Sequence, residues 1–130
     1  MAWLTLFTGC AEFPAPSCLL PAEQHMVVAE LFFSRNIKGR QLLTDAEWGE
    51  FAAQTISPNF PEGFTAFDGE GQWRNPQTRQ IAGGRTKILL VAAKPEPDLP
   101  RRLSAVIDAY KAQFHQQSVG IITRDTCAAF

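Results

Sequence analysis

Hydrophobic residues along the chain fall into dense runs that predict strands. Three such runs are rich in Val, Ile and Phe and lie in residues 25–37, 85–95 and 118–130. Residues 63–74 give a weaker strand signal, with β-forming residues at both ends and glycines between them. The turn-forming sequence NPQT follows this segment, and we expect the next strand to begin near Ile81.

Two segments with apolar residues at helical spacing alternate with these strands. The first begins with a capping box, in which the Thr44 hydroxyl accepts the backbone N–H of Glu47 and Glu47 bonds back to the cap. We expect Pro58 to end this helix, and Asp98 to cap the second. The apolar faces comprise Trp48, Phe51, Ala52, Thr55 and Ile56 in the first helix, and Leu99, Leu103, Val106, Ile107, Tyr110 and Phe114 in the second.

The resulting order, β-α-β-β-α-β, predicts an α+β fold. Two split βαβ halves usually form a ferredoxin-like sandwich, in which both helices cover one face of an antiparallel four-stranded sheet. We assign residues 25–130 to this domain, and its length suits a single hydrophobic core.

The strands are apolar on both faces, although the two helices cover only one. Leu31, Phe32 and Phe33 are consecutive, as are the five apolar residues 88–92. Successive strand residues point to opposite faces, so the second face also needs a cover. A partner subunit, a ligand or the N-terminal segment would supply it. We favour self-association, as in dimeric α+β barrels, and therefore expect a homodimer.

Composition excludes some classes of partner. The 130 residues carry a net charge of −1 and show no basic stripe, so we expect no nucleic-acid partner. No apolar run reaches the roughly 18 residues that span a bilayer. Membrane association would therefore require a lipid anchor.

The three cysteines are Cys10, Cys18 and Cys127. They contain no C-x-x-C pair and no histidine at metal-ligand spacing, so we expect no metal and no cofactor. Cys18 and Cys127 lie near opposite ends of the domain. They are either two separate thiols or, in an oxidising compartment, a disulfide.

The N-terminal residues 1–24 resemble a lipoprotein signal remnant followed by a tether. Phe7-Thr8-Gly9-Cys10 approximates a lipobox, with Phe7 in place of the usual Leu and no Lys or Arg before the apolar stretch. A start upstream of this chain would explain that departure, and an ordinary apolar segment is the alternative. We favour the remnant, which makes Cys10 a lipidation site and predicts a periplasmic or lipid-anchored protein of the cell envelope.

The sequence FDGEGQWRNP, residues 67–76, is the most distinctive stretch. It lacks the third glycine of a dinucleotide-binding fingerprint, and no helix follows it. We interpret Gly69 and Gly71 as a β-bulge or strand bend. Trp73 then either packs while Arg74 pairs with a neighbouring acid, or the bend directs Asp68, Gln72, Trp73 and Arg74 to form the polar rim of a small cavity at the open sheet face.

A polar cluster is the candidate ligand site. Arg35 could pair with Asp68 structurally, or the group could bind a small anion or polar carbonyl compound. Ser-His catalysis has no support from the positions of His25 and His115. The candidate ligand-binding residues are Arg35, Asn36, Asp68, Gln72, Trp73 and Arg74.

The chain resembles the bacterial domain-of-unknown-function family 3574 at ELFFSRNI, DAEWGEF, ISPNFPEGFTAFDGEGQWR and AYKAQFHQQSV. The likeness covers roughly residues 27 to 130 and implies a small exported protein of unassigned activity, with no catalytic residues to carry over. The loop at residues 37–40 departs from the family's Gly-rich pattern. Recurrent family positions are Arg35, Asn36, Trp48, Pro58, Phe60, Pro61, Gly63, Asp68, Gly71, Gln72, Trp73 and Arg74.

Two functions are consistent with these observations. The favoured one is a non-catalytic envelope protein that binds a small ligand or a protein partner through the open sheet face. The alternative is a small cofactor-free enzyme of the dimeric α+β barrel type. Its cavity under the sheet would be lined by Phe32 or Phe33, by Trp73, and by polar groups such as Arg35, Asp68 and Arg74.

Overall fold

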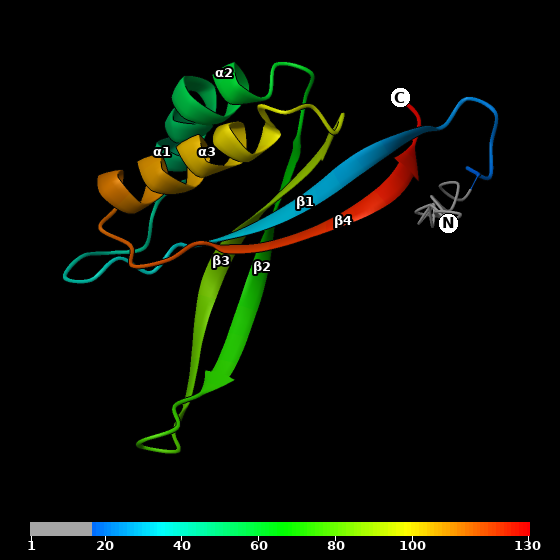
Figure 1. Ribbon diagram of the computed structural model, residues 1–130. Helices are drawn as coiled ribbons and strands as arrows, with labels where there is room; N and C mark the ends of the chain where they lie inside the picture. The colour runs from blue at the N-terminus through cyan, green and yellow to red at the C-terminus, as the bar shows by residue number, and fades with distance from the viewer. Residues whose placement is uncertain (1–16) are drawn as a thin grey trace, which may run out of the picture.

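The computed structural model describes residues 17–130 as a four-stranded antiparallel sheet with helices on one face (Figure 1). The strand order is β2-β3-β1-β4, which confirms the predicted ferredoxin-like α+β fold. Cys10 and the lipobox-like sequence lie outside the described residues. The elements are β1 (Gln24–Ser34), α1 (Asp45–Phe51), a π-helical segment (Ala52–Ile56), α2 (Ser57–Asn59), β2 (Thr65–Arg74), β3 (Ile81–Ala93), α3 (Leu99–Gln113) and β4 (Gly120–Ala128).

The two central strands supply the buried centre of the core. β1 and β3 pair from Val27–Ala93 to Ser34–Thr86, so the odd-numbered residues of both strands lie on one face and the even-numbered residues on the other. Leu31, Phe33, Leu89 and Val91 face the helices and are completely inaccessible to solvent. Their alternation with half-buried neighbours is the pattern of a sheet with one covered face.

Aromatic side chains join the helices to the sheet. The Phe33 ring centroid lies 4.8 Å from that of Tyr110, 5.3 Å from Trp48 and 6.3 Å from Phe51. These tilted and edge-to-face arrangements suit the ring quadrupoles. The buried Tyr110 hydroxyl donates a hydrogen bond of 2.6 Å to the Ser34 carbonyl, so the one tyrosine is a core residue with its polar atom satisfied.

The first helical region differs from the prediction at its C-terminal end. The Thr44–Glu47 capping box forms as expected. Pro58, however, does not end the helical region, which continues to Asn59. The preceding residues 52–56 widen into a π-helix. A π-turn shifts the hydrogen-bond register, so the missing proline N–H and the bulk of its ring are accommodated.

The second helix also begins differently from the expectation. Asp98 occupies the N-cap position, but its carboxylate accepts no capping hydrogen bond. It lies instead 3.6 Å from the Arg101 guanidinium. Asp98 has helical dihedral angles (φ −88°, ψ −6°), whereas a capping side chain normally needs an extended backbone.

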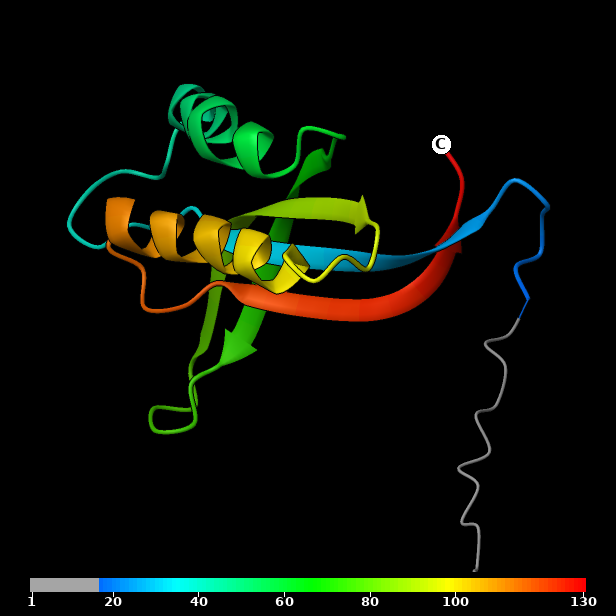
Figure 2. The same cartoon turned by 45° about the horizontal axis from the view of Figure 1, so that its top comes forward.

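The second face of the sheet is not covered by any described element (Figure 2). Phe67, Trp73 and Ile122 on this side are 48%, 55% and 49% exposed. They belong to the same side of the ladder as Phe32, Ile88 and Leu90, which are half-buried. We call this surface the open face.

The β2–β3 hairpin extends beyond the rest of the sheet as a two-stranded arm (Figures 1 and 2). Its register is unbroken from Thr65–Leu90 to Arg74–Ile81, so the β-bulge, one of the two alternatives considered for Gly69 and Gly71, is absent. Gly69 and Gly84 allow close packing instead. A Cβ on Gly69 would lie 2.8 Å from Ile88 Cδ1, and one on Gly84 would overlap the Asn36 amide.

Candidate functional site

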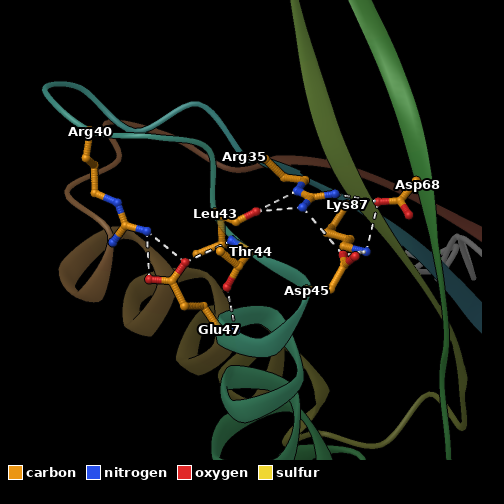
Figure 3. Close-up of polar contacts among 8 residues, drawn as sticks. All are labelled: Arg35, Arg40, Leu43, Thr44, Asp45, Glu47, Asp68 and Lys87. Carbon is orange, nitrogen blue, oxygen red and sulfur yellow. Dashed lines mark hydrogen bonds and ion pairs between the residues drawn. The ribbon is translucent and has the colours of Figure 1, made fainter.

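Four charged side chains form a compact cluster where β1, β2, β3 and the start of α1 meet (Figure 3). Arg35 and Lys87 are buried, whereas the Asp45 and Asp68 side chains are 78% and 62% exposed. The Lys87 ammonium lies 3.0 Å from Asp45 Oδ1 and 2.8 Å from Asp68 Oδ1. Arg35 contacts the same two oxygens at 3.4 and 3.2 Å.

The end of β1 positions Arg35. Its backbone N–H donates to the Arg85 carbonyl at 2.9 Å, which continues the ladder with β3 by one residue. The side chain turns toward the helical layer, where Nε and Nη2 donate to the Leu43 carbonyl at 2.9 and 2.6 Å. Arg35 therefore connects β1, the loop before α1 and the two aspartates. Its ion pair with Asp68 is the structural pair that the sequence analysis considered.

Lys87 is the member of the cluster that sequence reasoning missed. It lies opposite Asp68 in the β2–β3 ladder and faces the helices. Burial alone would lower the pKa of Lys87, but hydrogen bonds and charges from Asp68 and Asp45 outweigh burial and raise it. The available signal was a lysine within an apolar strand, two positions before Leu89 and therefore on the same buried face.

Asp68 is held in its charged form by the same contacts. The hydrogen bond from Lys87 lowers the pKa of Asp68 against the opposing effect of burial, and the charges of Lys87 and Arg35 add to this. Asp68 is therefore a poor general base or acid near neutral pH, because its ordinary pKa is already far below that range.

A polar cavity of about 500 Å³ adjoins the cluster. The charges lining it, together with buried Lys87, are three basic and three acidic side chains. An incoming anion would therefore compete with carboxylates already bound to the two buried cations. The lining residues are Arg35, Asp45, Asp68, Gly69, Glu70 and Arg85.

The other expected site residues do not join this cluster. Asn36 faces Gly84, on the opposite side of the sheet from Arg35. Arg74 is six residues beyond Asp68 along a regular strand, or about 20 Å away. Gln72 is exposed and lies opposite Gly83 in the arm.

Trp73 does not share a cavity with the charged cluster. The enzyme alternative of the sequence analysis had placed it in one cavity with Arg35 and Asp68. Successive side chains of β2 point to opposite faces, and Trp73 is five residues after Asp68. Asp68 faces the helices with Lys87, so Trp73 lies on the open face. Trp73 is 55% exposed, and Arg74 forms no ion pair within residues 17–130. Neither the packed tryptophan nor the paired arginine is therefore observed.

An apolar groove of about 420 Å³ lies at the opposite end of the open face. Leu90, Ala92 and Thr65 supply its floor from β2 and β3. Glu62 is the one charged lining residue and is paired with Arg102. Sequence reasoning missed this groove, because its walls come from separate segments. The remaining lining residues are Met26, Gly63, Phe64 and Phe130.

The structure joins Cys18 and Cys127 in a disulfide across 109 positions of sequence. His25 lies directly opposite Cys127 in the β1–β4 ladder. Its ring nitrogen and the two sulfur atoms lie within 4.8 Å of one another. The sequence spacing of the cysteines and histidines gave no sign of this grouping, because strand pairing and the disulfide bring together residues that are distant in sequence.

None of the helices in residues 17–130 combines the length and hydrophobicity needed to cross a bilayer.

The fold is that of a small α+β protein. Two solved structures are similar to this chain. The first is a phage SAM lyase in complex with S-methyl-5'-thioadenosine, with a TM-score of 0.62 and 11% sequence identity; the match covers 88% of this chain and 97% of that one. The same phage enzyme in its apo state gives 0.58 and 12%, over 89% and 97%. At this identity the likeness concerns the fold.

The chain itself belongs to the family described as Protein of unknown function (DUF3574), whose profile matches residues 28–130. This agrees with the family resemblance of its sequence motifs. A search of curated proteins found no match.

Proposed function

We propose that this protein is a non-catalytic binding protein of the cell envelope that pairs with a second copy of itself through the open face and holds a small apolar molecule there. The uncovered apolar surface of the sheet carries this proposal. Phe67 and Ile122 are about half exposed on this surface. Large exposed apolar patches normally mark an interaction site.

The charges on the open face favour a second copy as the partner. Arg124 Nη2 lies 2.9 Å from Glu30 Oε1, and these residues stand among apolar neighbours on the two strands β4 and β1. A twofold axis passing between them would place each charge against the opposite charge of the other copy. A two-subunit interface of this symmetry requires such a self-complementary patch.

The size and lining of the apolar groove suit a small ligand. Its volume of about 420 Å³ lies within the range of small-molecule sites, roughly 300–1,000 Å³. The groove shares Leu90 with the open face, so pairing of two copies would roof the groove and exclude water from it. Its lining suits an apolar molecule with few polar groups.

Two features support an envelope location. The Cys18–Cys127 disulfide is of a kind that persists in oxidising compartments. The lipobox-like sequence ending at Cys10 would supply an anchor. Mass spectrometry of protein from the native cell tests this, with a diacylglyceryl modification on Cys10 as the expected result and an unprocessed N-terminus as the contrary one.

Two isoleucines on opposite faces of β4 provide a matched test of pairing. Ile122 lies on the open face and Ile121 on the other, with exposed fractions of 49% and 41%. Sedimentation of Ile122→Lys should show a monomer under conditions where wild type and Ile121→Lys are dimers. A monomeric wild type at micromolar concentration, or equal behaviour of the two variants, would reject the face-to-face pair.

Ligand binding is tested separately with an apolar fluorescent probe, anilinonaphthalene sulfonate. We expect the dimer to bind the probe in the groove and Ala92→Glu to abolish the binding; sedimentation of this variant checks its pairing, because Ala92 lies on the open face opposite Val28. Unchanged binding in Ala92→Glu would remove the groove from the proposal and leave the pairing intact.

A small enzyme is the second candidate, favoured by the fold likeness to the phage SAM lyase. Its site would be the polar cavity beside Arg35 and Asp68. Calorimetric titration with S-methyl-5'-thioadenosine tests this candidate. Binding that is lost in Asp68→Asn would support it, and absence of heat in the wild type would reject that ligand.

A further inference from the structure

We infer that Cys18, His25 and Cys127 form a zinc site when the disulfide between the two cysteines is reduced. This inference is independent of the proposed function, because the three residues lie outside both the apolar groove and the charged cluster.

Strand pairing gathers the three potential ligands. His25 and Cys127 are opposite each other on neighbouring strands, so their side chains share one face of the sheet. Cys18 approaches from the segment before β1 and is held there by the disulfide. One donor atom from each residue lies within 4.8 Å of the other two.

The donor set is the one that zinc prefers. Two thiolates and an imidazole bind Zn²⁺ at about 2.3 Å and 2.0–2.1 Å, usually in a tetrahedral arrangement. Calcium and magnesium require oxygen ligands and do not match it. Three protein ligands leave a fourth position for water or another side chain.

The surroundings allow a metal to bind. A cavity of about 390 Å³ at this place is lined by His25, Cys127 and Asp125, among others. The His25 side chain is exposed and takes part in no hydrogen bond within residues 17–130. It can therefore turn a ring nitrogen toward the sulfur atoms, and the cavity leaves room for water as the fourth ligand.

The two states exclude each other chemically. A dithiol reductant supplies two electrons and two protons to the disulfide and becomes a disulfide itself, which leaves Cys18 and Cys127 as thiols. Zinc binding then displaces both thiol protons, and the sulfur atoms separate to roughly 3.7 Å, as two 2.3 Å bonds at a tetrahedral angle require. Both the disulfide and the bound zinc would link the segment before β1 to the end of β4.

The chain offers matched controls for a test. Cys10→Ser leaves only the two cysteines of the site, and His115 is a second histidine at the far end of α3. We would titrate the reduced Cys10→Ser protein with Co²⁺ in the absence of oxygen. We expect one Co²⁺ per chain, with visible bands of tetrahedral cobalt and a thiolate-to-cobalt charge-transfer band that Zn²⁺ abolishes.

Removal of His25 separates a three-ligand site from simple thiol binding. His25→Ala should weaken Co²⁺ and Zn²⁺ binding by roughly tenfold or more, whereas His115→Ala should not change it. Circular dichroism of the oxidised variants checks that both remain folded. The disulfide-bonded protein should show no thiolate charge-transfer band.

Alkylation supplies a second measurement that does not use cobalt. Zn²⁺ should protect both reduced thiols from iodoacetamide in the parent protein and protect them less in His25→Ala at the same Zn²⁺ concentration. Absence of tetrahedral cobalt bands in the reduced protein, or equal zinc protection in the parent and His25→Ala, would overturn the inference.

Discussion

Lys87 and Asp68 lie opposite each other on β3 and β2, and the ammonium group of the lysine is 2.8 Å from Asp68 Oδ1. The lysine is buried while most of the carboxylate is exposed, so the acid satisfies a cation that would otherwise be costly at this depth. Because Arg35 contacts the same oxygen at 3.2 Å, one carboxylate joins three segments of the fold.

Arg35→Lys is expected to destabilise the protein although it preserves the charge. A lysine cannot reproduce the two hydrogen bonds from Nε and Nη2 to the Leu43 carbonyl. We expect the free energy of unfolding to fall by about 1.5–3 kcal/mol, the range for hydrogen bonds to charged groups. Urea denaturation measures this, with Arg85→Lys, an exposed arginine, as the control. Equal stability of the two variants would contradict the role assigned to Arg35.

The contacts of Asp68 predict a dependence of stability on acid. Its pKa is lower in the folded protein than in the unfolded chain, where the ordinary value is 3.8. The stabilisation is therefore complete above that value and is lost as pH falls through the folded pKa. Thermal melting of wild type should show a steeper loss below about pH 4 than Asp68→Asn. Parallel curves would show that Asp68 is not the group responsible.

Tyr110 should titrate well above an ordinary phenol. Burial raises its pKa to about 12 from 10.0, and it is the single tyrosine, so phenolate absorbance reports this group alone. A group with a raised pKa contributes stability below its unfolded pKa and loses it between pH 10 and about 12. We expect alkaline unfolding and phenolate formation to coincide. Titration near 10 in a folded protein would show that the hydroxyl is accessible.

The arm glycines differ in what surrounds them, which predicts different responses to alanine. A Cβ at Gly69 would clash with Ile88, whereas one at Gly71 would come no closer than 3.9 Å to the Gly84 carbonyl. Gly69→Ala should lower the free energy of unfolding by about 1 kcal/mol, the low end of the cost of overpacking, because the terminal methyl group of Ile88 can move aside.

Gly71→Ala is the matched control and should leave the stability nearly unchanged. Both variants can be compared by urea denaturation at one protein concentration. If Gly71→Ala were as destabilising as Gly69→Ala, general strand flexibility rather than the contact with Ile88 would explain the glycines.

Residue periodicity by itself determined the element order and the ferredoxin-like sheet. Alternating strand side chains and the Thr44 capping box are local features, because each depends on residues a few positions apart. The same local pattern predicted that one sheet face would be apolar and without a helix. Exposed Phe67 and Ile122 agree with that prediction, while the partner that covers them remains a proposal.

Only the tertiary structure decided which side chains meet. Lys87 joined Arg35 and Asp68, and His25 joined Cys18 and Cys127, through strand register that connects positions distant in sequence. The same register carried Arg74 away from Asp68 and turned Trp73 to the opposite face. Periodicity specifies the face on which a side chain lies, but contact between strands depends on their alignment, which the whole packed sheet determines.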